Sequence, residues 1–180
     1  MTSEQLIEFW FGDDVKKRWF KSTAEFDQQL RDLFENLWQQ ARDNQLADWK
    51  HSASGCLALT ILFDQMPLNM YRGQAASFST EALARDVSHH AIKKDFHRQF
   101  DEEKQAFLYM PFMHSENLND QKYAIELFKL IGREDNLRFA RHHHDIVKRF
   151  GRFPHRNHIL GRESTADELA YLESDQAFTG

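Results

Sequence analysis

The chain has 180 residues, of which 41% are hydrophobic and 28% charged, as is typical of one globular domain with a real hydrophobic core. Its seven glycines and three prolines disfavour a β-sandwich, which needs many turns, and no apolar run approaches the roughly 20 residues that cross a bilayer. A net charge of −5 argues against a general nucleic-acid surface, which requires a broadly basic domain.

Apolar residues recur at helical spacing along almost the whole chain, and no segment shows the alternation of a half-buried strand. Helices are therefore predicted at about residues 3–11, 23–44, 54–66, 80–94, 102–110, 118–131, 134–150 and 166–173. Because the links between them are short, consecutive helices are expected to pack as antiparallel neighbours in stacked pairs. The predicted fold is all-α, in a single domain over residues 1–180 with a frayed tail at 174–180.

The ends of these helices follow from capping residues and from helix breakers. The spacing of Ser22–Glu25 and of Thr165–Glu168 is that of a capping box, in which two side chains satisfy free backbone donors. Ser79 is the expected cap of the fourth helix. Pro67 and Pro111 are expected to end the third and fifth helices, because the residue before a proline disfavours the helical conformation.

The amino terminus and the cysteine content indicate a reducing compartment. The opening residues, MTSEQLIEFWFGDD, contain neither the basic region nor the small-residue cleavage site of a signal peptide. The one cysteine, Cys56, lies in the apolar segment GCLALTILF and cannot form an internal disulfide. We therefore expect a cytoplasmic protein in which Cys56 is a small buried hydrophobic residue and not a nucleophile.

A basic segment lies near the carboxyl end of this acidic chain. Residues 141–162 contain six arginines and lysines and one acid, a local charge of +5, so the remaining residues carry −10. Within it, RFGRFPHRN (Arg149–Asn157) combines three arginines, one histidine and two phenylalanines. Such a concentration of cations favours either an anion site or an internal network of ion pairs.

Ionisable residues also occur on helix faces that should point inward, at Asp64, Asp120 and His143. A buried carboxylate without a donor costs several kcal/mol or takes up a proton, so both aspartates require partners. The guanidinium groups of the basic segment are expected to supply them. The sequence therefore predicts a shared polar interior formed by Asp64, Gln65, Arg72, Glu116, Asp120, Gln121, Arg149, Arg152, Arg156 and Asn157.

This interior has three interpretations. If donors exceed carboxylates, it is a pocket for a small anion bearing phosphate or carboxylate, where His114, His143 or His155 could transfer protons. If every arginine is paired, it only fixes how the helices pack. The third interpretation is that the helical repeats form a surface that binds a protein or peptide partner. No metal or cofactor is expected, because the chain lacks zinc-ligand spacing and a glycine-rich phosphate loop. Whether the protein is an enzyme stays open.

Several long motifs resemble those of a known family. They are LIEFWFG, RWF with FD at 26–27, LALTILFDQMPLNMYRG, FLYMPFMHSENLNDQ and RFGRFPHRNHILGREST, in this order. Together they resemble the bacterial family called domain of unknown function 924, over about residues 6–172. The resemblance implies an all-α fold like tetratricopeptide repeats, a right-handed superhelix of helix pairs, but no reaction, substrate or catalytic residue. The family usually has arginine where this chain has Leu68, so a shared pocket would be less basic there.

Overall fold

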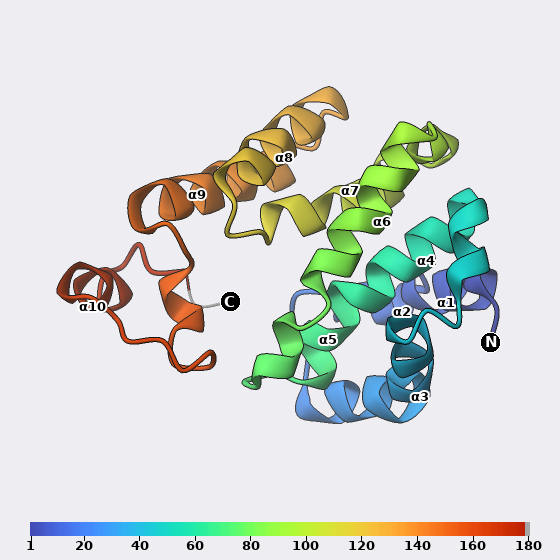
Figure 1. The fold of residues 1–180 in the computed structure, drawn as a ribbon, viewed down its shortest axis with the longest axis horizontal. Coiled ribbons are helices and arrows are strands. Elements are labelled where there is room, and N and C mark those ends of the chain that lie inside the picture. Colours follow the sequence, from blue (N-terminus) through green and yellow to red (C-terminus); the bar gives the residue numbers. More distant parts are fainter. Residues whose placement is uncertain (179–180) are drawn as a thin grey trace. The chain divides into compact units, whose positions relative to one another are not determined.

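The computed structural model describes residues 1–178, and all regular secondary structure among them is helical (Figure 1). The predicted all-α class is therefore confirmed. The chain divides into two compact units, the first formed by residues 1–72 and 76–111, the second by residues 73–75 and the chain from Phe112 onward. The expected single domain and right-handed superhelix stay predictions. No helix in the described part of the chain combines the length and the apolar character that crossing a membrane requires.

The first unit is built around one helix that is buried on almost every side. Its α-helices are α1 (Ser3–Trp10), α2 (Asp13–Lys16), α3 (Ala24–Arg42), α4 (Ala53–Phe63), α5 (Gln65–Met70), α6 (Glu81–Lys93) and α7 (Glu102–Met113), the last continuing into the second unit. The 3-10 helices in the connections are η1 (Ala47–His51), η2 (Ala75–Phe78) and η3 (Phe96–Gln99). Ten of the eleven residues of α4 are buried, and α4 packs against α1, α3 and α6. A helix that is apolar all round belongs inside a core.

Cys56, on α4, has the environment expected of a hydrophobic residue. The side chain is fully buried, and burial raises the pKa of its thiol to about 11. Because the thiolate is the nucleophilic form, this cysteine is unreactive near neutral pH.

Two prolines that were expected to end helices lie inside them instead. Pro67 is the third residue of α5, where a backbone N–H has no partner within the helix and its absence costs little. The predicted helix over 54–66 is therefore two helices that meet at Asp64. Pro111 lies within α7, which continues beyond its predicted end to Met113.

Two predicted helix caps are displaced by one residue. Thr23, and not Ser22, caps α3, and its hydroxyl accepts a hydrogen bond from the N–H of Phe26 at 3.3 Å. Thr80, and not Ser79, precedes α6, and its hydroxyl donates to the last carbonyl of α4 at 2.7 Å instead of capping. Neighbouring Ser and Thr residues carry the same hydroxyl group, so sequence spacing alone does not choose between them.

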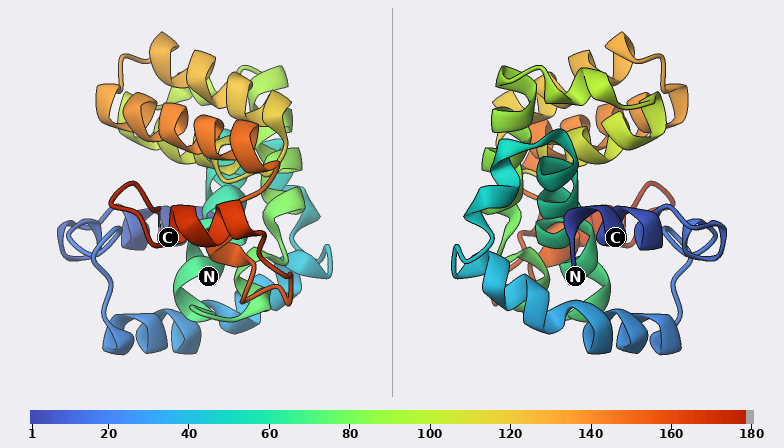
Figure 2. Two further views of the ribbon diagram at one scale, coloured as in Figure 1. Left: turned by 90° about the vertical axis from the view of Figure 1, so that its left-hand side faces the viewer. Right: turned by 90° about the vertical axis from the view of Figure 1, so that its right-hand side faces the viewer.

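The second unit contains a helical hairpin followed by a loop and a short helix. The hairpin helices α8 (Leu118–Leu130) and α9 (Glu134–Phe150) lie side by side in every view (Figures 1 and 2). Gly151 ends α9 as predicted, with a φ of +74°, which glycine adopts at little cost. The chain then forms η4 (Pro154–Arg156) and α10 (Ala166–Leu172). The predicted capping box of Thr165 and Glu168 is present at the start of α10.

The hydrophobic core of the second unit differs from the prediction at two places. Phe139, one turn before His143 on the face of α9 that was predicted to point inward, is 46% exposed. The buried face of α9 instead runs through Leu137, Ala140, His143, Ile146 and Val147. The tail was expected to fray, but the N–H of Phe178 donates to the hydroxyl of the buried Tyr171 at 2.9 Å. Residues 179–180 of the predicted tail lie outside the described residues.

Candidate functional site

A network of charged hydrogen bonds holds the segment that follows α9. The carboxylate of Glu116, between α7 and α8, accepts two hydrogen bonds from Arg162, at 2.7 and 2.9 Å. It also accepts one from the N–H of Phe153 at 2.8 Å. Burial alone would raise the pKa of Glu116, but these donors outweigh it and the pKa is lowered. Glu116 is therefore held as a carboxylate in a fixed orientation.

The network continues through Asn157 to a second ion pair. The Nε of Arg162 donates to Asn157 Oδ1 at 3.0 Å, and Asn157 Nδ2 donates to Glu168 at 3.2 Å. Glu168 is 2% exposed and accepts two hydrogen bonds from Arg152, at 2.7 and 2.8 Å. The hydrogen bond from Arg152 is the main cause that lowers the pKa of Glu168 to about 2. Arg152 and Arg162 are thus paired with carboxylates, as the structural interpretation of the basic segment expects.

Two residues predicted for the polar interior do not lie inside it. Arg149 is exposed, and its guanidinium lies over the ring of Phe150, 4.6 Å from the centroid. Asp120 is only partly buried and accepts a hydrogen bond from the Ser115 hydroxyl at 2.6 Å. Both residues occupy the terminal turn of a helix, where helical spacing is the weakest guide to burial.

Three of the predicted residues belong to the first unit. Asp64 is 2% exposed and accepts a hydrogen bond from the side chain of Gln65. Arg72 donates to Asp27 at 2.8 Å and to Asn69 at 2.9 Å. The other candidates belong to the second unit, so the convergence of the two sets stays a prediction.

Gln121 closes the end of a helix in the second unit. It is fully buried, and its amide nitrogen donates to the carbonyls of Met113 and Ser115, at 2.6 and 2.7 Å. These carbonyls lie at and just beyond the end of α7, where no further turn of helix supplies a donor. This geometry gives Gln121 a structural task, and the ligand-binding role that the sequence predicted for it stays a prediction.

The three histidines predicted to handle protons gather in the second unit. His114 follows α7, His143 lies on α9 and His155 lies in η4. The ring of His143 is 6.5 Å from that of His114 and 5.4 Å from that of Phe153, which is 5.6 Å from His155. The ring of Phe178 lies 4.4 Å from that of His143 and 5.1 Å from that of His155. We call His114, His143, His155 and Phe153 the histidine cluster, against which Phe178 packs.

The imidazoles of His143 and His155 are neutral at pH 7. Burial, with repulsion from His114, lowers the pKa of His143 to about 3, and burial, with the charge of Arg156, lowers that of His155 to about 4. His143 Nδ1 lies 2.8 Å from the Phe139 carbonyl, so we assign the proton to Nδ1, which leaves Nε2 as an acceptor. His155 Nδ1 is buried without a hydrogen-bond partner among the described residues.

Arg156 places a positive charge beside this cluster. Its guanidinium lies over the ring of Phe153, 4.6 Å from the centroid, and donates to the carbonyl of His114 at 3.0 Å. The residue is 5% exposed. A charge in such a low-dielectric position acts more strongly on its surroundings than a solvated one. Within residues 1–178, no three or more His, Cys, Asp or Glu side chains are arranged to hold a metal ion.

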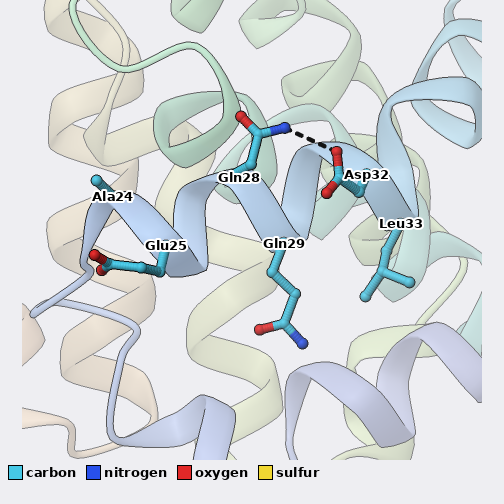
Figure 3. Close-up of a pocket in the computed structure, with 6 residues that line it drawn as sticks. All are labelled: Ala24, Glu25, Gln28, Gln29, Asp32 and Leu33. Carbon is cyan, nitrogen blue, oxygen red and sulfur yellow. Dashed lines mark hydrogen bonds between the residues drawn. The ribbon is translucent and has the colours of Figure 1, made fainter.

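A separate surface feature lies on α3 in the first unit. Figure 3 shows an open depression lined by exposed residues of this helix, namely Ala24, Glu25, Gln28, Gln29, Asp32 and Leu33. Gln28 donates to Asp32 at 2.8 Å, and the side chains of Gln29 and Leu33 point away from that pair. None of these residues was predicted for a site, and Glu25 was assigned only to a capping box.

Three residues that form the network or pack against the cluster were missed from the sequence. Glu168 was recognised only as half of a capping box, although its position close to the basic segment made it an available carboxylate. Arg162 lies in the basic segment but outside the quoted motif. Phe178 has no signal in the sequence, because a polar tail after the last helix normally frays.

Comparisons with known proteins extend the resemblance seen in the motifs. A protein of unknown function from Agrobacterium tumefaciens, ATU0120, has a similar solved structure, with 39% sequence identity and a TM-score of 0.89 over 95% of this chain and 96% of that one. No curated protein matches the chain. The pattern of the family described as "Bacterial protein of unknown function (DUF924)" matches residues 6–176. The chain therefore belongs to this bacterial family, DUF924.

Proposed function

We propose that this protein binds a small anionic metabolite, bearing a phosphate or a carboxylate, at the histidine cluster of the second unit. The observation that carries the proposal is the meeting of three histidines from separate segments, His114, His143 and His155, beside the positive charge of Arg156. Packing alone does not require several imidazoles at one place, since apolar side chains fill a core at lower cost.

The electrostatics of the cluster support an anion that also carries a proton or a hydroxyl group. Arg156 supplies attraction for the negative charge, and the neutral imidazole of His143 offers an acceptor at Nε2. A phosphate monoester or a hydroxy acid provides both kinds of group. Bound charge would also favour the protonated form of the imidazoles, so binding should be accompanied by proton uptake.

A titration of the protein with sodium phosphate, followed by nuclear magnetic resonance of the histidine ring signals, tests the proposal. Signals of His114, His143 and His155 should move with saturation, while that of the exposed His51 in the first unit should stay. Sodium chloride at equal ionic strength is the control, because screening alone moves the signals of charged surfaces. Equal changes in phosphate, in a panel of carboxylates and in chloride would contradict the proposal.

The second candidate function, recognition of a peptide, is supported by the depression on α3. Leu33 is 47% exposed there, on the same helix as the acidic side chains of Glu25 and Asp32. This combination suits a basic peptide with apolar residues. A labelled peptide that alternates lysine and leucine should bind in a fluorescence assay, and Leu33→Arg should abolish binding. Equal binding to the variant would exclude the depression as its site.

We also propose a cytoplasmic location. The chain has one cysteine, Cys56, and its buried thiol leaves no disulfide that an oxidising compartment would have to maintain. Fractionation of cells that produce the tagged protein at native levels tests this, and recovery from the periplasm would contradict it.

A further inference from the structure

We propose that residues Ser174–Phe178 form a removable cover over the histidine cluster, with Phe178 as the group that shields the imidazoles. The part of this inference that concerns ligand access rests on the proposed function. The cover itself is argued from contacts within the second unit, so the two can fail independently.

Phe178 lies against two imidazoles of the cluster. Its ring centroid lies 4.4 Å from that of His143 and 5.1 Å from that of His155, both in edge-to-face geometry. The ring of His142 lies 6.2 Å away on the same helix as His143. One aromatic side chain from the end of the chain thus lies against imidazoles of α9 and η4 together.

The ring of Phe178 packs against the core of the second unit, and the segment that carries it is otherwise held by few interactions. Ser174, Asp175 and Gln176 are exposed, and a turn is closed by the N–H of Ala177, which donates to the Ser174 carbonyl at 3.0 Å. Beyond this turn, the N–H of Phe178 donates to the Tyr171 hydroxyl at 2.9 Å. A segment with exposed residues and few buried contacts opens locally at a much lower cost than global unfolding.

Opening this cover would change the cluster without disturbing the ion-pair network. The side chains of Arg152, Arg162, Glu116 and Glu168 bond to one another and to residues between His114 and Glu168. None of these bonds involves residues 174–178. The network therefore keeps η4 in place while Phe178 leaves, and the imidazoles of His143 and His155 gain access to solvent or to a ligand.

Chemical modification of histidine by diethyl pyrocarbonate, located by mass spectrometry, measures the cover without a ligand. In Phe178→Ala the modification rates of His143 and His155 should rise by about tenfold, since a partly buried aromatic ring contributes roughly 1.4 kcal/mol, a factor of ten. Tyr171→Phe removes only the hydroxyl that anchors the tail, and it should raise the same rates by a smaller factor. Phe139→Ala, an exposed phenylalanine on α9, is the matched control and should leave both rates unchanged.

Four outcomes separate this inference from the proposed function. Faster modification with tighter binding of inorganic phosphate in Phe178→Ala supports both. Faster modification of Phe178→Ala, with no phosphate binding to the wild type or to this variant, supports the cover and contradicts the anion site. Unchanged modification rates at His143 and His155 in both tail variants would overturn the cover. A fall in the midpoint of denaturant unfolding equal to that of a core variant, Phe153→Ala, would also overturn it, because Phe178 would then be an ordinary core residue.

Discussion

Arg152 and Glu168 form a two-point ion pair, with Nε to Oε1 at 2.7 Å and Nη2 to Oε2 at 2.8 Å. The same carboxylate accepts a hydrogen bond from the N–H of Thr165 at 2.8 Å, as half of the capping box of α10. One side chain therefore caps a helix and anchors the segment that follows α9. This double use pairs the charge of Arg152 with a carboxylate inside the second unit.

Replacing Glu168 by Gln should lower stability near neutral pH and flatten its dependence on pH between about 4.5 and about 2. The folded pKa is lowered from 4.5 to about 2, chiefly by Arg152. A depressed carboxyl pKa gives stability that is present above the unfolded value and lost as pH falls through the folded one. Denaturant unfolding at several pH values across this range measures how steeply the free energy of unfolding changes with pH. Glu163→Gln, an exposed carboxyl in the same segment, is the control, and parallel profiles for wild type and Glu168→Gln would contradict the ion pair.

Phe153 should be a principal packing residue of the second unit. It is 0% exposed and belongs to the core with Ile146, Val147 and Tyr171. Phe153→Ala should lower the free energy of unfolding by about 3–5 kcal/mol, because it removes buried surface and leaves a cavity. Phe139→Ala should change it by only about 0.5 kcal/mol. Similar losses in the two variants, measured by denaturant melts, would contradict the assigned faces of α9.

His143 should make the fold sensitive to mild acid. Burial is the main cause that lowers its folded pKa from 6.5 to about 3, with help from His114, His142 and His155. A histidine held neutral contributes stability that is present above pH 6.5 and lost as pH falls toward the folded value. His143→Leu should therefore lose less stability than wild type between pH 6.5 and pH 4. His51→Leu, at an exposed site, should keep the wild-type slope, and an unchanged slope in His143→Leu would show that the imidazole is not buried.

The fold class and most helix limits were predictable from local rules. The limits of α9, Glu134–Phe150, agree with the sequence because an apolar stripe and the left-handed Gly151 mark them. The helix ends predicted at Pro67 and Pro111 were wrong. Pro67 is tolerated in the first turn of α5, where its missing N–H has no partner to lose, and α7 continues through Pro111 to Met113. Local patterns do not report such tolerance.

The partners of the basic segment were less predictable. Arg152 pairs with Glu168 and Arg162 with Glu116, contacts that depend on how a loop returns across α10 and α7. Helical spacing carries no information about a loop's path, so only the sign of the charges was predictable. The position of Phe178 depends on a hydrogen bond to Tyr171 and on ring contacts with His143 and His155, for which the tail has no motif.

The ligand proposal leads to a prediction about stability, because a molecule that binds only the folded state stabilises it. Phosphate at about 100 times its dissociation constant should add roughly 2.7 kcal/mol to the free energy of unfolding. His155→Leu should remove this effect, since His155 belongs to the cluster beside Arg156, whose charge already lowers its pKa. Arg149→Ala removes an exposed charge of the same basic segment and should keep the full effect.

Because a bound anion raises the pKa of neighbouring imidazoles, the stabilisation should grow as pH falls from 7 to 5. Thermal melts of the wild type and of each variant, in phosphate and in chloride of equal ionic strength, measure this stabilisation. If Arg149→Ala loses the effect and His155→Leu keeps it, phosphate binds the outer face of α9, and the histidines serve packing alone.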